Sequence, residues 1–344
     1  MAEVMKTATN SDIEALKKRQ KVRDTIIKVI TYIFLVIMAF IVVFPFYWMI
    51  NSSLKTYEEY HLVFGEKIFA ETGLDFSVYK LPTFFPKILD FNNYYEALFG
   101  GQYDAALAAI ERGENPYQYM QLVKSMVTTL LMGVASTALS IFVTIFAAFA
   151  FGRLKFKGRE LLFTILLMTM MIPGELFTIT NYETVSLLKW THRMNPNTWK
   201  IFLSYTLPFL VSVFYIYLLR NNFKQIPDEL YYAAKVDGSS DFKYLFKVMV
   251  PLSMPSIISI IILKMMGAWN SYVWPNLVGS TNNGTYMLVS VILRKNYTAA
   301  TDGSYADIPV RMAACVIVSI PLFLVFILFR KYIIRGVSKS GIKG

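Results

Sequence analysis

Few side chains in this sequence are of the types that carry out catalysis, and those few are poorly spaced for it. The chain has one cysteine, Cys315, and two histidines, His61 and His192, which lie far apart. A lone cysteine forms no internal disulfide, and neither histidine has a partner at metal-ligand spacing. Gly336 and Gly341 have the glycine spacing of a phosphate-binding loop, but Ile342-Lys343 replaces the required Lys-Ser/Thr. We therefore expect no catalytic residue, no metal site and no nucleotide-derived cofactor in this chain.

Two charged residues interrupt stretches that are otherwise apolar. Glu175 follows Pro173-Gly174, and Lys264 lies within a run of Ile, Leu and Met. A charge inside a membrane helix costs about 2.5–3.5 kcal/mol on insertion scales, so such a residue is expected to face a partner or a water-filled cavity. Lys264 lies twelve residues after Leu252, and Glu175 lies fourteen residues after Leu161. At 1.5 Å per residue these are about 18 Å and about 21 Å from the ends of their spans that lie on the same side. The two side chains are thus expected at similar height, with Trp269 and Asn270 one to two turns further out.

The stretches around these residues indicate a membrane protein. Of the 344 residues, 55% are hydrophobic and only 17% are charged, whereas soluble domains carry about 25% charged residues. The apolar residues gather in runs instead of being spread along the chain. The net charge of +11 does not indicate nucleic-acid binding, because the basic residues follow the gaps between the runs.

Six segments are long enough to cross a membrane, which takes about 20 apolar residues. Five are uncharged or nearly so: Val29–Ile50, Ser125–Gly152, Ile201–Leu219, Val248–Leu263 with its continuation past Lys264, and Met312–Phe329. The sixth starts at Leu161 and is broken by Pro173-Gly174-Glu175, the one break that we expect. The first run is too long, and its end too bulky, for a cleaved signal peptide. The predicted fold is an all-α membrane protein with six transmembrane helices.

Basic residues set the predicted orientation. They gather at Lys17–Lys28, Arg153–Arg159, Arg220–Lys247 and Arg330–Lys343, which are alternate sides of six spans, so both termini are expected in the cytoplasm. The loop 51–124 has ten acidic and six basic residues, which suits the outer side. The predicted organisation is a cytoplasmic segment 1–28, a first transmembrane helix 29–50, an extracytoplasmic loop 51–124 with small helices such as Tyr103–Arg112, a core 125–330 and a cytoplasmic tail 331–344.

The cytoplasmic loop 220–255 is far longer than the two to eight residues that usually join helices. Pro227 suits the first position of a helix, with Asp228 and Glu229 in the first turn, where the helix dipole favours anions. Gly238 suits the left-handed conformation that ends a helix. The loop therefore predicts a helix–Gly–helix unit, which we call the elbow (220–255).

The second helix of the elbow is expected to start at a cap, Ser239 or Ser240. Helical spacing places four apolar side chains on one stripe: Phe242, Leu245, Phe246 and Met249. Pro251 and Pro255 are expected to stop this helix at the membrane. An ordinary interhelical loop is the alternative, and about 30 residues with such clear helix signals favour a docking element.

The elbow sequence Ile226–Gly238, followed by Val250-Pro251-Leu252, resembles the "EAA…G…LP" loop of ABC importer permeases. Further segments resemble the carbohydrate-type members of that family: Phe151–Gly158, Met171–Glu175, Ala268-Trp269-Asn270 and the tail 331–344. The resemblance includes the first span, runs from about Lys124 to the end, and is greatest to the second permease of maltose-type importers. Tyr232 stands where the family has the Glu of "EAA", with Glu229 one turn earlier. The stretch 100–117 is an insertion relative to the family.

The resemblance implies a type I ABC importer transmembrane domain in the cell membrane of a bacterium or archaeon. It implies that ATP and Mg are bound by partners, and that this chain is not an enzyme. The implied partners are a second permease subunit in a heterodimer, two ATPase subunits, an extracytoplasmic solute-binding protein and membrane lipid.

The resemblance also suggests roles for single residues. The implied ATPase-coupling residues are Glu229, Tyr232, Ala233, Ala234, Asp237, Gly238, Phe242 and Phe246. The implied ATPase-contacting tail residues are Ser340, Gly341 and Lys343. Glu175, Lys264, Trp269 and Asn270 are candidates for the translocation path, against the alternative of an ion pair or of a bond from Lys264 to the partner permease.

The expected solute is a sugar or oligosaccharide, with a polyol or glycerol phosphate as the alternative. A secondary transporter is the competing class, but it favours repeated halves, discontinuous helices and intramembrane carboxylates. A membrane-embedded enzyme is a third class, and it requires His, Cys or paired acidic residues inside the spans.

Overall fold

A computed structural model describes residues 10–56, 59–60, 83–99, 103–115, 120–191, 198–279, 287–298 and 308–338. All regular elements in these ranges are helices. The chain divides into two compact units, Met1–Leu89 and Asp90–Gly344. Each is described by itself.

The first unit is dominated by one long helix, α1 (Asn10–Ser53). Its 44 residues correspond to about 66 Å, and no residue of its most apolar window is buried within the chain. Just beyond its end, the Lys55 ammonium donates to the Thr83 carbonyl at 2.7 Å. The Glu59 carboxylate accepts from the Thr83 hydroxyl at 2.8 Å and from the Lys87 amide at 3.0 Å. These contacts fasten the chain on both sides of residues 61–82.

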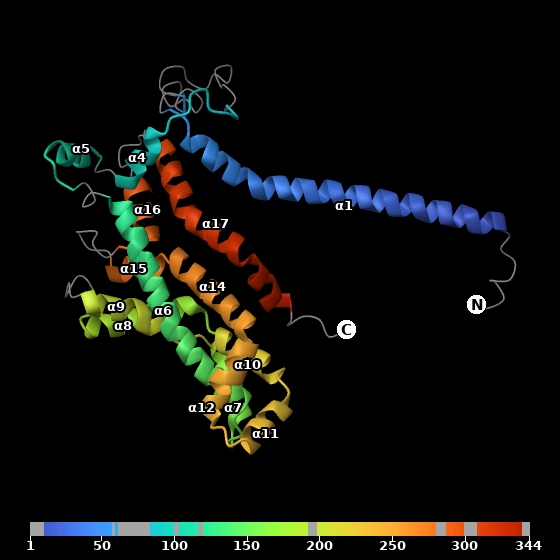
Figure 1. The fold of residues 1–344 in the computed structure, drawn as a ribbon. Coiled ribbons are helices and arrows are strands. Elements are labelled where there is room, and N and C mark those ends of the chain that lie inside the picture. Colours follow the sequence, from blue (N-terminus) through green and yellow to red (C-terminus); the bar gives the residue numbers. More distant parts are fainter. Residues whose placement is uncertain are drawn as a thin grey trace. The chain divides into compact units, whose positions relative to one another are not determined.

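The second unit is built around α6 (Gln121–Gly152), which packs against α10 (Val213–Lys224) and α14 (Met254–Asn270). The long last helix, α17 (Ile308–Ser338), lies beside α14 (Figure 1). The buried face of α6 carries mostly small and hydroxyl side chains: Ser125, Thr129, Gly133, Ser136, Thr137, Ser140 and Thr144. Small residues let membrane helices approach closely, because there is little bulk between the backbones.

Short helices lie at the two ends of this bundle. At one end are α4 (Asn92–Phe99) and α5 (Tyr103–Glu111), and at the other are the elbow helices α11 (Asp228–Val236) and α12 (Asp241–Tyr244) (Figure 1). The predicted helix at Tyr103–Arg112 is confirmed, one residue shorter. The helices α15 (Val273–Gly279) and α16 (Val289–Thr298) lie toward the α4 end. The helices α4 and α5 of the predicted outer loop therefore lie at the opposite end of the unit from the elbow helices.

Three described helices are long and apolar enough to cross a membrane: α1, α6 and α17. Three bent pairs pass the same test together, so the described residues offer six spans if each pair is one span. The first pair joins α7 (Arg159–Thr169) to α8 (Gly174–Leu187) at 91°. The break predicted at Pro173-Gly174 is therefore confirmed.

The expectation of a single break is wrong, because two further spans are bent. The helix α9 (Thr198–Thr206) and a 3-10 turn η4 (Leu207–Phe209) meet α10 at 57°. The segment Asp241–Leu252 meets α14 at 78°. Proline explains both breaks, since Pro208 lies in the tight turn before one bend and Pro251 and Pro255 flank the other. Each proline removes a backbone donor and obstructs the preceding turn.

Candidate functional site

The first helix of the elbow is α11 (Asp228–Val236), capped by Pro227 and not, as predicted, starting with it. Gly238 has a φ of +69°, which confirms the predicted left-handed end. Its amide donates to the Lys235 carbonyl, and the Ser239 amide donates to the Ala234 carbonyl at 2.9 Å. A Cβ at position 238 meets no atom within 4 Å. The backbone conformation, and not lack of space, therefore calls for glycine here.

The second helix of the elbow begins at Ser240, whose hydroxyl accepts from the Lys243 amide at 3.3 Å. This confirms one of the two predicted caps. The helix runs through α12 (Asp241–Tyr244), a π-helical turn η5 (Leu245–Met249) and α13 (Val250–Leu252), and the bend follows at Ser253. The helix therefore ends between Pro251 and Pro255, the two prolines that were expected to stop it.

The predicted apolar stripe is split in two. Leu245 and Met249 are fully buried, whereas Phe242 and Phe246 are 65% and 48% exposed. The physical reason is that Phe242 and Phe246 form one i,i+4 row of the helix and Leu245 and Met249 form the next, and only the second row faces the core. Phe242 and Phe246 still contact the protein at the Phe146 ring, with centroids 6.0 and 5.9 Å away. The buried anchors of the second helix are instead Leu245, Met249 and the neighbouring Tyr244.

Side chains lock the two elbow helices together. The Tyr231 hydroxyl donates to the Asp241 carboxylate at 2.9 Å, and the Lys235 ammonium lies 2.9 Å from the same oxygen. The hydrogen bond to Asp241 raises the pKa of the Lys235 amine. The rings of Tyr231 and Tyr244 meet edge to face at 5.1 Å. The elbow is therefore a rigid unit, not a loose connection.

The outer face of α11 remains uncovered in the chain. Glu229, Tyr232, Ala233, Asp237 and Gly238 are exposed, and Ala234 is partly buried against the core. Val236, an apolar side chain on the same helix, is 88% exposed. The Lys155 ammonium donates to the Tyr232 hydroxyl at 3.1 Å, and this bond raises the pKa of Lys155.

A buried arginine holds the start of the elbow, and sequence reasoning missed it. Arg153, just after α6, donates to the carbonyls of Phe223 at 3.3 Å and Ile226 at 2.8 Å. It also forms an ion pair with Asp228. Cations suit these positions, because the last carbonyls of a helix have no partner within it. The sequence analysis used Arg153 only for topology, although its place at the end of an apolar run was a usable signal.

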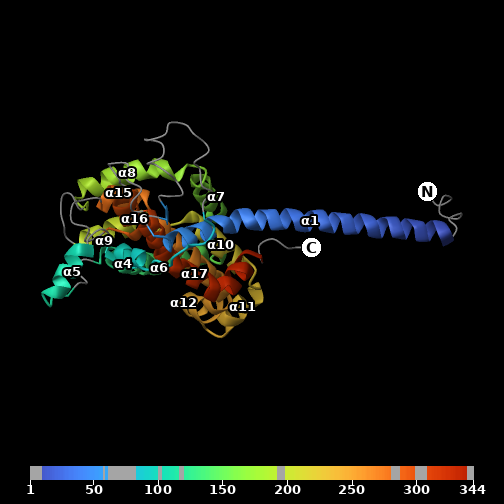
Figure 2. The ribbon, with the colours of Figure 1, turned by 90° about the horizontal axis from the view of Figure 1, so that it is seen from above.

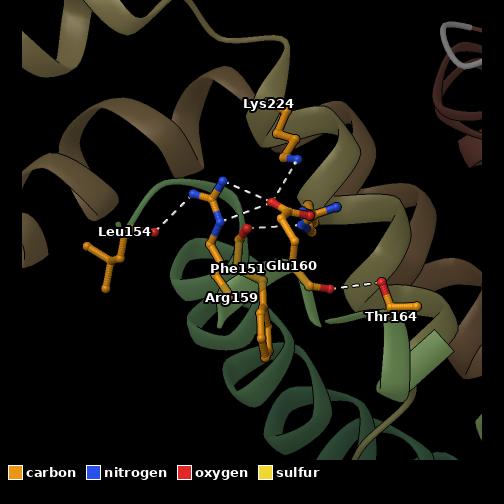
Figure 3. A network of polar contacts seen from close by, with 7 residues as sticks. Phe151, Leu154, Arg159, Glu160, Thr164 and Lys224 are labelled. Carbon is orange, nitrogen blue, oxygen red and sulfur yellow. Dashed lines mark hydrogen bonds and ion pairs between the residues drawn. The ribbon is translucent and has the colours of Figure 1, made fainter. Parts of the chain in front are cut away.

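A second arginine makes the reverse contact. Arg220, on α10, donates to the Phe151 carbonyl at the end of α6 at 2.9 Å and lies over the Phe163 ring at 3.9 Å. Its guanidinium also bonds Glu160 at 2.6 Å. Glu160 is approached as well by Arg159 and Lys224 (Figure 3). The ends of α6 and α10 are thus joined by two arginines, each bonding the other helix.

The two charged residues of the apolar stretches are not paired with each other. The Lys264 ammonium donates to the carbonyl of Phe209 at 2.7 Å, within the break before α10. Glu175 is exposed in the first turn of α8. The ion-pair alternative is therefore wrong in this structure, because the broken helix offers Lys264 a free carbonyl nearby. A break in a neighbouring helix would have pointed to this contact, because it leaves carbonyls without helical partners. The break between Phe209 and Val213 was not predicted from the sequence.

The other path candidates, Trp269 and Asn270, face different surroundings. Trp269 is 7% exposed and belongs to an apolar cluster with residues such as Leu122 and Val289. Asn270 is exposed, and its amide donates to the Met266 carbonyl at 3.0 Å. Ser340, Gly341 and Lys343 lie outside the described residues, as do His61 and His192.

Comparison with known proteins identifies the family. The model of the binding-protein-dependent transport system inner membrane component matches residues 140–339. The chain is 27% identical over 310 residues to the probable ABC transporter permease protein MG189 of Mycoplasma genitalium, covering 88% of this chain and 85% of that protein. It is 25% identical to the arabinooligosaccharides transport system permease protein AraQ of Bacillus subtilis, covering 95% and 99%. It is 29% identical to the sn-glycerol-3-phosphate transport system permease protein UgpE of Pectobacterium atrosepticum, covering 71% and 80%.

A solved structure has the same fold. It is that of a bacterial ABC transporter involved in the import of the acidic polysaccharide alginate, with a TM-score of 0.69 and 20% identity. The match covers 90% of this chain and 97% of that one. This all-helical, multi-pass inner-membrane chain belongs to the family of binding-protein-dependent transport system inner membrane components, as the permease subunit of an ABC importer.

Proposed function

We propose that this permease carries a sugar or oligosaccharide and is driven by two ATPase subunits, one of which docks on its elbow. The elbow is the observation that carries the proposal. It is internally locked, fastened to α6 by Arg153, and exposes one face of α11. Moving a two-state equilibrium from 1:99 to 99:1 takes about 5.5 kcal/mol of differential contact energy. A rigid elbow can pass a movement of the ATPase on to the transmembrane helices, whereas a flexible loop changes its own conformation instead.

The elbow residues take separate roles in this proposal. Glu229, Tyr232 and Asp237 offer polar contacts to the ATPase, while Ala233 and Ala234 permit close backbone approach. Gly238 sets the turn. Phe242 and Phe246 are exposed beside this face and contact Phe146. ATP and Mg are bound by the ATPase subunits, and Ser340, Gly341 and Lys343 of the tail reach toward them.

The proposed solute path lies between this chain and a second permease subunit. Glu175 is exposed on α8 beside Leu176 and Phe177, which are also exposed. A carboxylate amid apolar side chains is not stable against lipid, so a protein partner or water must cover it. Lys264 and Asn270 are the other proposed path residues. Trp269 supports them from the cluster behind, and an extracytoplasmic binding protein delivers the solute.

Gly238→Val tests the coupling role. Valine at positive φ is strained by about 1–3 kcal/mol, so the turn between the elbow helices should shift. We expect transport and substrate-stimulated ATP hydrolysis to be lost in a complex that still inserts. The matched control is Gly113→Val, since Gly113 has a φ of +73° and open space around it but follows α5. Normal stimulated ATPase activity in Gly238→Val would show that the elbow does not couple.

The solute class is tested by uptake into proteoliposomes holding the whole transporter and its binding protein. The panel is maltose, an arabinotriose and sn-glycerol 3-phosphate. The sugar proposal rests on the relative named for arabinooligosaccharides, which this chain matches over 95% of its length. We expect uptake of a sugar. Uptake of glycerol phosphate alone would favour the second candidate, supported by the relative named for that solute.

A further inference from the structure

Three basic side chains converge on one carboxylate at the start of the elbow. The Glu160 carboxylate accepts from Arg220 at 2.6 Å and lies 2.9 Å from the Arg159 guanidinium and 3.5 Å from the Lys224 ammonium (Figure 3). Arg159 and Glu160 begin α7, whereas Arg220 and Lys224 lie on α10. The carboxylate therefore joins the start of one span to the end of another.

Two of the partners of this carboxylate, Arg220 and Arg159, are held in place by other groups, whereas Glu160 itself is exposed. The Arg220 side chain is 6% exposed and is fixed by the Phe151 carbonyl and the Phe163 ring, while Glu160 is 58% exposed. Arg159 is held in turn by the Leu154 carbonyl at 3.0 Å. Glu160 is thus the accessible link between groups that are themselves anchored. Exposed ion pairs contribute little to folding stability.

The helix that starts at Glu160 has few other attachments within the chain. Phe163 is its one buried residue among Arg159–Thr169, all of which the structure describes. Leu161 and Met168 are 66% and 58% exposed. The broken span α7–α8, which carries Glu175 beyond its bend, is therefore fastened to α10 near its start. The polar attachment is Glu160, and the apolar one is the Phe163 ring, which packs against Tyr217 and Arg220.

The same contact lies at the start of the elbow, just before α11. Lys224 is the last residue of α10, and α11 begins at Asp228. We propose that Glu160 is a positioning residue for transport, which makes α7 follow the elbow when the ATPases close. The inference rests on the proposed coupling role of the elbow and adds the path by which movement reaches the span with Glu175. Glu160 acts through Arg220 and Lys224 and contacts no solute.

The test removes the charge and keeps the size, with Glu160→Gln in the whole transporter. Spin labels are placed at Met168→Cys and Val236→Cys in a Cys315→Ser background, and their separation is measured without nucleotide and after trapping with ATP and vanadate. We expect one narrow distance distribution in both states of the wild type, because α7 and the elbow move together. In Glu160→Gln the distribution should broaden or shift on trapping.

The accompanying assay is uptake of the panel compound that the wild type transports best, divided by ATP hydrolysed. We expect a loss of about fivefold or more, the lower end of common allosteric coupling factors, with unchanged complex yield. Glu160→Asp, which keeps the charge, should retain part of the uptake per ATP that Glu160→Gln loses. The matched control is Glu114→Gln, which removes another exposed Arg–Glu ion pair and should leave both measurements at the wild-type value.

If Glu160→Gln fails to assemble, the same distance and uptake measurements are made on Lys224→Gln and Glu160→Asp. The expected broadening of the distances and the expected loss of uptake per ATP are then smaller. Distances and uptake per ATP equal to wild type in the assembled variants would overturn the proposal. If Gly238→Val also keeps stimulated ATP hydrolysis, the elbow role fails with it. If Gly238→Val is uncoupled and only the Glu160 variants behave as wild type, this inference alone fails.

Discussion

Lys264 shows how one charged residue is accommodated among apolar helices. Its ammonium satisfies the Phe209 carbonyl at the break before α10, and its pathway role remains a proposal. The methylenes of lysine pass along apolar neighbours while the charged head reaches a polar group. The residue therefore joins the span that follows the elbow to the span that precedes it.

Lys264→Met keeps the bulk of the side chain and removes the charge. We predict that transport per assembled complex falls, because the proposed path loses its cation. Yield should also fall modestly, since the Phe209 carbonyl loses its donor and the hydrocarbon layer holds no water to replace it. Lys264→Arg, which keeps a donor, is the control. Reduced yield with intact transport per complex would leave Lys264 a purely structural role.

Residue-level prediction succeeded where the cause is local. Gly238 and Ser240 were predictable, because a left-handed turn and a helix cap depend on a few neighbouring residues. Arg153 and Arg220 were not, because each bonds a carbonyl on another helix, and the sequence does not say which helix ends meet. The contact of Lys264 required knowing about a break more than 50 residues away.

At the scale of elements, the second elbow helix shows the limit of periodicity. A 3.6-residue pattern groups Phe242 with Leu245, but the core covers only Leu245 and leaves Phe242 exposed. The six apolar segments were recognisable from composition. The two unexpected bends were not, since proline also occurs within continuous helices: Pro45 lies within α1 and Pro321 within α17.

This division of the stripe predicts two different phenotypes. Leu245→Ala should lower stability by about 2–5 kcal/mol, because it opens a cavity at a fully buried position. Phe242→Ala, at a side chain that is 65% exposed, should leave thermal stability nearly unchanged. Melting of the purified complex, followed by loss of monodisperse protein on heating, distinguishes the two. Equal destabilisation would mean that Phe242 is covered in the assembly.

At the scale of the whole molecule, the topology remains to be tested. The prediction is six spans with both termini inside, and the separation of α4–α5 from α11–α12 within the second unit suits it (Figures 1 and 2). In a Cys315→Ser background, single cysteines are introduced as Ser77→Cys, Asn197→Cys, Lys157→Cys and Ser340→Cys. An impermeant thiol reagent should label the first two in intact cells. Labelling of Lys157→Cys there would refute the six-span arrangement.

The bend between α7 and α8 also has a consequence for the insertion of the chain into the membrane during its synthesis. The two halves have 11 and 14 residues, or about 17 and 21 Å, and each is shorter than the roughly 30 Å hydrocarbon layer. Neither half is long enough to be retained in the bilayer alone as it leaves the ribosome. The insertion machinery must therefore hold this segment until later helices arrive to cover it. The contacts of Glu160 with Arg220 and Lys224 can form only after α10 has been synthesised, so α7 lacks this attachment until then.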